Sequence, residues 1–368
     1  MAVQAAVASD SPGDYVELLD RVMHASRSER PADVTAAARM LQQQPRSPQS
    51  ERHIALFLGL RLWQEGHRES AIREFERVTR HPEYDTAFGI ASHLIGAYRH
   101  DRGDDEGALP FLQQSIAALD ATGDARGLHL ALTTLGRTLR DFAAASELGR
   151  ADSFTDAPQS EVLDLYEEAL DALERAVLIA EEGLAEGLTA LVPLVELAVT
   201  YRRMGAMEMA VATVEQSLDS LVESDPHSTW ALTVAASLYR EQGNDRAAGD
   251  AIDRAVALAK RSGTASLDLA RALNVLATIE RKTPTSRDAA VRHAAESVAM
   301  GRQLHNNRHT SQALHTYALA LLGRGQEDDI QSARPALDEA EKLLFGLGDK
   351  RGLNMVRRTR KGFLRKFS

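Results

Sequence analysis

The strongest constraint on the fold of this chain is a helical hairpin pattern that recurs about seven times. Each copy begins with a small residue, followed three positions later by a large residue and four positions further on by a turn residue, usually glycine. An alanine, a large apolar residue and another small residue then follow at helical spacing. The small residues that open the copies are Gly59, Gly96, Gly136, Ala198, Ala236, Ala277 and Ala318.

The residue types in this pattern indicate how each hairpin packs. Small residues let two antiparallel helices approach closely, while the large residues fill the groove beside them. Glycine between the helices, as at Gly66, Gly205 and Gly243, supplies a left-handed backbone conformation that other residues resist. Because each hairpin has apolar surface on two sides, the copies must stack to bury it. The low aromatic content, 5%, also favours helices over sheets.

The fourth copy, like the first and the fifth, shows a family resemblance clearly. Its series Ala198, Tyr201, Gly205, Ala210 and Val214 resembles the tetratricopeptide repeat family, and the match extends over residues 51–348. The copies are longer than the family's usual ~34 residues, and this long form is similar to bacterial peptide-sensing regulators and kinesin-light-chain-type arrays. The resemblance implies an all-α fold, a right-handed superhelical solenoid of stacked helix-turn-helix repeats.

The pattern divides the chain into four segments. Residues 1–12 are expected to form a flexible tail, and residues 13–50 an N-terminal helical cap or degenerate repeat. Residues 51–348 carry about seven repeats. Residues 349–368 are expected to form a basic capping helix.

The third copy departs from the pattern. Its two expected helices are separated by about twenty residues more than a tight hairpin needs. Residues 143–160 include Gly149, Asp152 and Pro158, which are typical of loops. We therefore expect an extended loop inside this repeat, and a tolerated surface insertion explains it better than a functional lid.

Catalytic motifs are absent from the sequence. It contains no HExxH, no glycine-rich phosphate loop and no nucleophile elbow. No cysteine is present, so the chain has no disulfide or thiol nucleophile, which suits a cytoplasmic protein. In the cluster His305, His309 and His315, the first two are four residues apart, as on one helix face, but Asn306 and Asn307 indicate a turn between them. The sequence thus predicts no enzyme, no metal site and no cofactor.

Function in a repeat array resides mainly on the face lined by the first helix of each hairpin. The resemblance implies that three positions of each first helix point to this inner face. They are the position three before the opening small residue and the positions one and four after it. The residues at these positions that we consider as partner-binding candidates are His93, His100, Arg137, Arg140, Arg202, Arg240, Asn274, Arg281 and His315.

These candidates gather arginine in a protein whose net charge is −10. The planar guanidinium suits carboxylates and phosphates, and the resemblance implies that such residues can hold an acidic peptide. An alternative is that Arg140, Arg202, Arg240 and Arg281, each expected in a last helical turn, only interact with the helix dipole.

A second basic surface is expected at the C-terminus, where no acidic residue follows Lys350. Apolar residues interleave there at near-helical spacing, so a capping helix with a basic outer side is favoured over a site for nucleic acid or lipid. The basic residues of this tail that we consider are Arg357, Arg358, Arg360, Lys361, Arg365 and Lys366.

The sequence therefore predicts a cytoplasmic, non-catalytic adaptor or regulator that binds a protein or peptide segment, with acidic segments favoured. The alternative is a peptide-sensing regulator whose superhelix changes shape on ligand binding and controls a partner or a DNA contact. Nucleic acid could bind only through the tail, since no basic recognition helix is visible near the N-terminus. No apolar stretch reaches the ~20 residues that span a bilayer.

Overall fold

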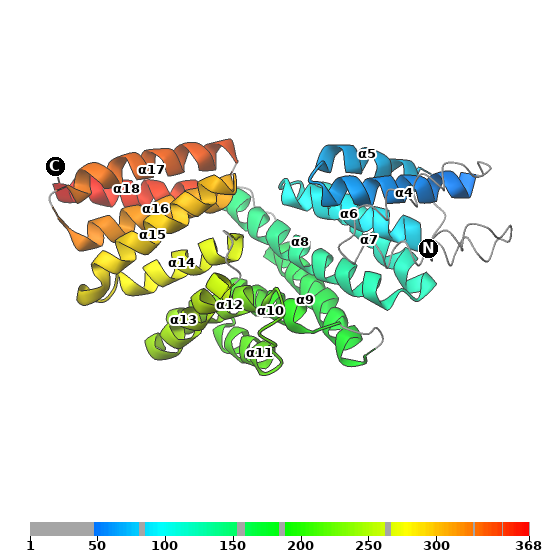
Figure 1. The fold of residues 1–368 in the computed structure, drawn as a ribbon, viewed down its shortest axis with the longest axis horizontal. Coiled ribbons are helices and arrows are strands. Elements are labelled where there is room, and N and C mark those ends of the chain that lie inside the picture. Colours follow the sequence, from blue (N-terminus) through cyan, green and yellow to red (C-terminus); the bar gives the residue numbers. More distant parts are fainter. Residues whose placement is uncertain are drawn as a thin grey trace. The chain divides into compact units, whose positions relative to one another are not determined.

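The computed structural model describes residues 48–80, 85–152, 159–183, 188–261, 266–326, 328–347 and 349–367. Within them the chain forms fifteen α-helices, α4 to α18, one short 3-10 turn at Pro284–Ser286, and no strand (Figure 1). The all-α prediction is confirmed. The expected tail at 1–12 and almost all of the expected cap at 13–50 lie outside the described residues.

Fourteen of the helices form the seven expected pairs, and α18 follows alone. The first helices are α4 (Pro48–Gln64), α6 (Thr86–Asp101), α8 (Ala125–Asp152), α10 (Leu191–Arg203), α12 (Ser228–Gln242), α14 (Leu267–Glu280) and α16 (Asn307–Arg324). The second helices are α5 (Arg68–Thr79), α7 (Asp105–Thr122), α9 (Gln159–Glu181), α11 (Met207–Asp219), α13 (Asp245–Arg261), α15 (Arg287–Gln303) and α17 (Asp329–Gly346). The last helix is α18 (Lys350–Phe367).

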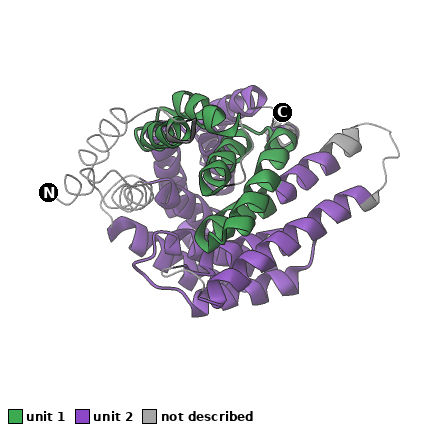
Figure 2. Cartoon of the chain, turned by 90° about the vertical axis from the view of Figure 1, so that its right-hand side faces the viewer, with its two compact units in different colours: residues 1–138 green, residues 139–368 purple. Residues whose placement is uncertain are grey.

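The chain divides into two compact units, residues 1–138 and residues 139–368, with the boundary inside α8 (Figure 2). In unit 2, α10, α12, α14 and α16 are successive neighbours, and each packs on its own second helix. This neighbourhood places equivalent residues of successive repeats on adjacent helices. No described helix has both the length and the apolar character needed to cross a membrane.

The turn glycines behave as predicted. Gly66, Gly103, Gly205, Gly243 and Gly325 all have positive φ, between 76° and 87°. A residue with a Cβ is strained in this conformation, so glycine ends the first helix and lets the second return.

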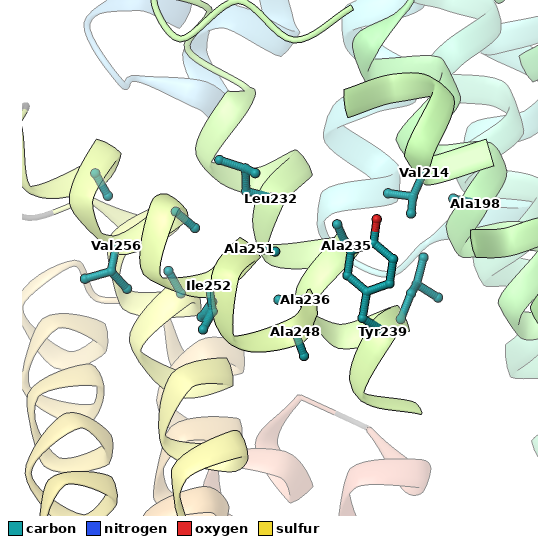
Figure 3. Packing of buried hydrophobic residues seen from close by; sticks show 14 of the residues in the cluster. Ala198, Val214, Leu232, Ala235, Ala236, Tyr239, Ala248, Ala251, Ile252 and Val256 are labelled. Carbon is teal, nitrogen blue, oxygen red and sulfur yellow. The ribbon is translucent and has the colours of Figure 1, made fainter. Parts of the chain in front are cut away.

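The small opening residues allow close helix packing. A Cβ built on Gly59 would lie 2.4 Å from Cε1 of Phe75, and one on Gly96 would lie 2.7 Å from Cγ of Leu112. In the fifth pair, Ala236 and Ala248 are both fully buried, and they lie where α12 and α13 meet (Figure 3). Small residues therefore set the distance between the two helices, as the pattern predicted.

The loop expected at residues 143–160 is wrong for most of its length. α8 continues through Asp152 and α9 begins at Gln159, and only residues 153–158 lie outside the described residues. The third copy has alanine where five of the six others have the turn glycine and the remaining one has Pro284. This alanine, Ala143, is buried against Val162 and Tyr166 of α9. With no glycine to end it, the first helix continues and the extra residues lengthen both helices.

Candidate functional site

Three arginines occupy equivalent positions on neighbouring helices of unit 2. Arg202 of α10, Arg240 of α12 and Arg281 at the end of α14 each stand four residues after the opening alanine of their repeat. Since these three helices pack on one another in order, the arginines form a row, which we call the arginine row. The row's members differ in what they contact.

Arg202 is neutralised by the next helix. Its Nε donates to Oε2 of Glu241 at 2.8 Å, and its second guanidinium nitrogen lies 2.7 Å from Oε1. Glu241 stands five residues after Ala236 and thus next to the arginine position of its own helix. A two-point pair of this kind leaves Arg202 little capacity for a ligand.

Arg240 and Arg281 have no such counterpart, because the position of Glu241 is filled differently in the next repeats. It holds Lys282 on the segment after α14 and Gly323 on α16. Arg240 keeps one 3.3 Å contact with the Glu241 carboxylate that Arg202 already holds. No described carboxylate lies within ion-pair distance of Arg281. Of these two guanidinium groups, only that of Arg240 contacts a described carboxylate, and it shares this Glu241 carboxylate with Arg202.

The two guanidinium groups are close enough to influence each other. Burial, and then the charge of Arg240, lower the pKa of Arg281. Burial, and then the charge of Arg281, lower the pKa of His315 on α16. Two positive charges thus lie close together at the ends of α12 and α14, and the shared Glu241 is the one described carboxylate within ion-pair distance of either.

Several polar atoms in this place are buried without a partner among the described residues. They are Nε of Arg240, Oδ1 of Asn274 and Nε of Arg281. Buried polar groups are almost always hydrogen-bonded in folded proteins, and leaving one unpaired is costly. We call Arg240, Asn274, Arg281 and His315 the arginine site. It offers donors in a fixed fork and one amide acceptor, which suits a carboxylate next to an N–H group.

Arg140 lies apart from this site and does not remain a binding candidate. It is 6% exposed and sits in the middle of α8, so its expected place in a last helical turn is wrong. Its guanidinium pairs with Asp141 at 2.9 Å and with the buried Glu196 of α10. Together these carboxylates raise the pKa of Arg140 although burial opposes its charge. Arg140 is therefore a structural link between two first helices.

In unit 1, the two expected inner-face histidines also contact protein partners. His93 Nε2 lies 2.9 Å from Oγ1 of Thr134, and His100 Nδ1 lies 2.7 Å from Oδ1 of Asp105. Burial, and then the charge of Arg137, lower the pKa of His93 to about 4, so this imidazole is neutral near pH 7. Arg137 has a buried Nε without a described partner. Arg137 is therefore the one cation of this unit's expected set that still offers a donor.

Two of the four basic side chains that the structure describes on the C-terminal helix pair with carboxylates of α17. Arg357 pairs with Glu341 at 2.7 Å, and Arg360 pairs with Glu341 and with Asp338 of α17, each at 2.8 Å. Arg358 and Lys361 are exposed, and no described carboxylate pairs with them. The side chains of Arg365 and Lys366 lie outside the described residues.

The three spaced histidines have separate surroundings. His305 stands in the turn before α16 with a φ of 51°, and Asn306 caps that helix. His309 Nε2 contacts Oγ of Ser297 at 2.9 Å, while His315 Nε2 lies 2.8 Å from Oγ1 of Thr359. The described residues contain no group of three or more His, Asp or Glu side chains that could hold a metal ion.

Sequence reasoning found the arginines but missed their carboxylate partners. The omitted residues are Glu241 and Glu196, which decide that Arg202 and Arg140 are occupied. A usable signal existed for the first of them, because Glu241 stands at one fixed position of the repeat. Comparing that position across copies separates the occupied Arg202 from Arg240 and Arg281.

Comparison with known proteins places the fold. Neither a scan against protein-family models nor a search of curated proteins finds a match. Among solved structures, the apo form of RapI covers 96% of this chain and 98% of its own length, with a TM-score of 0.61 and 12% identity. A Rap protein complexed with competence and sporulation factor covers 96% and 99%, with a TM-score of 0.59 and 10% identity. Aspartyl phosphate phosphatase F from Bacillus subtilis covers 82% and 76%, with a TM-score of 0.57 and 12% identity. Identities this low show the fold alone, and at that level the resemblance to tetratricopeptide-repeat proteins is confirmed.

Proposed function

We propose that this protein is a non-catalytic adaptor or regulator that holds an acidic segment of a protein or peptide at the arginine site. One observation carries this proposal. At the positions where a glutamate could have paired with Arg240 and Arg281, the next repeats hold Lys282 and Gly323 instead. In the fifth repeat the same position holds Glu241, which pairs with Arg202. The repeat geometry therefore allows such a pair, and the change of residue leaves Arg240 and Arg281 able to bind a ligand.

The energetics favour an anionic ligand in spite of the overall charge of −10. Interactions between exposed charges are screened beyond about 8 Å at physiological salt, so the local arrangement outweighs the net charge. A charge-assisted hydrogen bond contributes about 1.5–3 kcal/mol. Burial is the main cause of the lowered pKa of Arg281 and the charge of Arg240 is the second, and a carboxylate between the two arginines would also relieve this repulsion.

The competing explanation is that both arginines only interact with helix dipoles. Arg240 lies in the last turn of α12 and Arg281 caps α14, so the explanation applies to both. The two ideas differ in what the guanidinium fork does. Lysine at position 281 would keep the charge at the helix end but lose two-point binding of a carboxylate.

The test measures binding of a fluorescein-labelled nine-residue peptide of Gly, Ser and Asn with one glutamate, by fluorescence polarisation at low salt. Arg281→Ala should weaken binding by about tenfold or more, and Arg281→Lys should weaken it nearly as much. Arg302→Ala is the matched control, since that arginine is paired with Glu339 and lies outside the arginine site, and it should leave the affinity within about twofold. Equal affinity of wild type and Arg281→Ala, with both proteins folded by circular dichroism, would overturn the proposal.

A second candidate function is that of a peptide-sensing regulator that changes shape on binding. The match to Rap structures over 96% of the chain favours it, since one of them was solved with competence and sporulation factor bound. Small-angle X-ray scattering with and without saturating peptide separates the candidates. A change in radius of gyration supports the sensor, and an unchanged profile supports a static adaptor.

A further inference from the structure

The terminal helix α18 begins like the first helix of another repeat. Asp349 accepts a hydrogen bond from the backbone N–H of Gly352 at 2.8 Å, just as Asn306 accepts one from His309 at the start of α16. The register that this cap defines maps Ala313 onto Val356, and both are buried. The side of α18 that faces the preceding repeat is therefore built as in α16.

The side that would face a second helix is built differently. In the same register, the buried Leu314 and Ala318 of α16 correspond to Arg357 and Lys361, which are exposed. A long charged side chain in place of the small opening residue prevents the close approach of a partner helix. α18 is thus the first half of an eighth repeat, and the stack of described helices ends with it.

The inner face nevertheless continues from α16 to α18. His315 of α16 contacts Oγ1 of Thr359, and in unit 1 His93 of α6 contacts Oγ1 of Thr134 on the next first helix in the same way. Both histidines stand three residues before the opening position of their repeat, and both threonines stand two before it. Because the contact is the same, the position that His315 occupies on α16 is occupied on α18 by Arg358. Arg358 therefore lies next to His315 on the inner face. This side chain is exposed and has no described carboxylate partner.

We propose that the arginine site and Arg358 form one surface, and that its ligand is an extended polypeptide segment with two separated acidic residues. The inference rests on the proposed function and deepens it. Arg281 and Arg358 are two first helices apart, about 20 Å at 8–10 Å per packed pair, and are offset by about 10 Å along the helices. An extended segment at about 3.3 Å per residue bridges this span in roughly seven residues.

The sparse charge of the surface favours a polypeptide over a nucleic acid. Between the two ends lie uncharged groups, Asn274 and the neutral His315, whose pKa is lowered. Arg357 and Arg360 are taken by Glu341 and Asp338. Duplex DNA carries one charge per ~1.7 Å, so most of its phosphates would meet no cation here, whereas two spaced carboxylates would each meet one.

The experiment compares three fluorescein-labelled nine-residue peptides of Gly, Ser and Asn, measured by fluorescence polarisation. One has glutamate at positions 1 and 8, and each of the others has only one of these. Since Arg281 and Arg358 each bind one carboxylate, the double-acid peptide should bind wild type about tenfold more tightly than either single-acid peptide. Arg358→Ala should reduce the double-acid peptide to single-acid affinity, while Lys361→Ala, exposed on the same helix, should change nothing.

The outcomes separate the two proposals. If one glutamate binds and loses affinity with Arg281→Ala, but the second glutamate adds nothing, the proposed function stands and the extension to α18 is wrong. If no single-acid peptide responds to Arg281→Ala, the proposed function itself fails. Tighter binding of an oligo-dT strand, weakened equally by Arg358→Ala and Lys361→Ala, would show instead that α18 is a separate polyanion site and would overturn the inference.

Discussion

At the scale of single residues, the buried charges decide which cations are structural. Arg140 and Glu196 are 6% and 5% exposed and pair with each other between α8 and α10. Removing one partner of a buried pair leaves an uncompensated charge, which costs about 3–5 kcal/mol, whereas replacing both by apolar residues is often neutral. The pair should therefore tolerate joint replacement better than single replacement.

We expect Arg140→Leu to lower the free energy of unfolding by several kcal/mol, and Arg140→Leu/Glu196→Leu to recover most of it. Urea denaturation followed by circular dichroism measures both. The matched control is Arg202→Leu, whose exposed pair with Glu241 should contribute about 1 kcal/mol or less. Equal losses in the single and double variants would show that Arg140 contributes through its packing and not through its charge.

The buried histidine of α16 predicts a pH dependence of stability. Burial, and then the charge of Arg271, lower the pKa of His309 to about 4 from its usual 6.5. Between these values the unfolded chain binds a proton at this residue and the folded chain does not, so stability falls as the pH falls from 6.5. The full loss at pH 4 would be about 3 kcal/mol, at 1.36 kcal/mol per pKa unit.

Urea midpoints measured from pH 7.5 to 4.5 test this effect. His309→Gln should be less stable at pH 7.5, because it loses buried packing and the contact with Ser297, but its stability should fall less steeply below pH 6.5. Carboxylates affect both proteins equally, so the difference between the two curves isolates the histidine. Parallel curves would mean that His309 takes up its proton in the folded state.

At the scale of helices, local sequence signals correctly predicted the features that form within one hairpin. The turn glycines and small opening residues act within one hairpin, so their roles at Gly205 or Gly59 could be read without the structure. The length of α8 could not, because Gly149 and Asp152 are loop signals that tertiary packing overrides. The extension of α8 begins at Ala143, which packs against α9. Because this contact joins residues of two different helices, local sequence signals do not reveal it.

The candidate site shows the same limit. The resemblance placed Arg240 and Arg281 at inner positions, but whether each is paired depends on the next repeat, about forty residues away. Glu241 answers Arg202 across that distance. The sequence alone therefore predicts too many binding arginines, because it does not show which of them pair with a carboxylate of the neighbouring helix.

The terminal helix should be a cooperative part of the last repeat. Leu353 and Val356 are 8% and 1% exposed and belong to one apolar cluster with Leu337 and Leu344 of α17. We expect Leu353→Ala to cost about 2–5 kcal/mol, the range for a buried leucine. Hydrogen exchange should show faster exchange in α17 and α18, and unchanged exchange in α12 and α13.

The exposed Met355 offers the control for this prediction. It is 48% exposed on the same helix, so Met355→Ala should leave exchange in α17 unchanged. If Leu353→Ala accelerates exchange in α18 but not in α17, the helix is an appendage and does not stabilise the repeat beneath it.

At the scale of the whole molecule, ligand binding depends on which cations of this acidic protein lack a carboxylate partner. Unit 2 pairs several of its described cations across neighbouring helices, including Arg202 with Glu241 and Arg302 with Glu339. Arg240 and Arg281 stand out against this background because one position of the repeat changes from glutamate to Lys282 and Gly323. Changing that position should therefore control binding without altering any arginine.

The most direct test measures binding of the single-glutamate peptide to Gly323→Glu, with Gly323→Gln as the uncharged control of equal size. Space exists for a side chain, since the nearest atom to a Cβ there is the carbonyl oxygen of Arg281 at 4.0 Å. We expect Gly323→Glu to neutralise Arg281 and to weaken peptide binding by about tenfold or more, whereas Gly323→Gln should have little effect. Glu241→Gln should strengthen binding, because it frees Arg202 and Arg240. Unchanged affinity in Gly323→Glu, or equal losses in the glutamate and glutamine variants, would contradict the proposed role of Arg281.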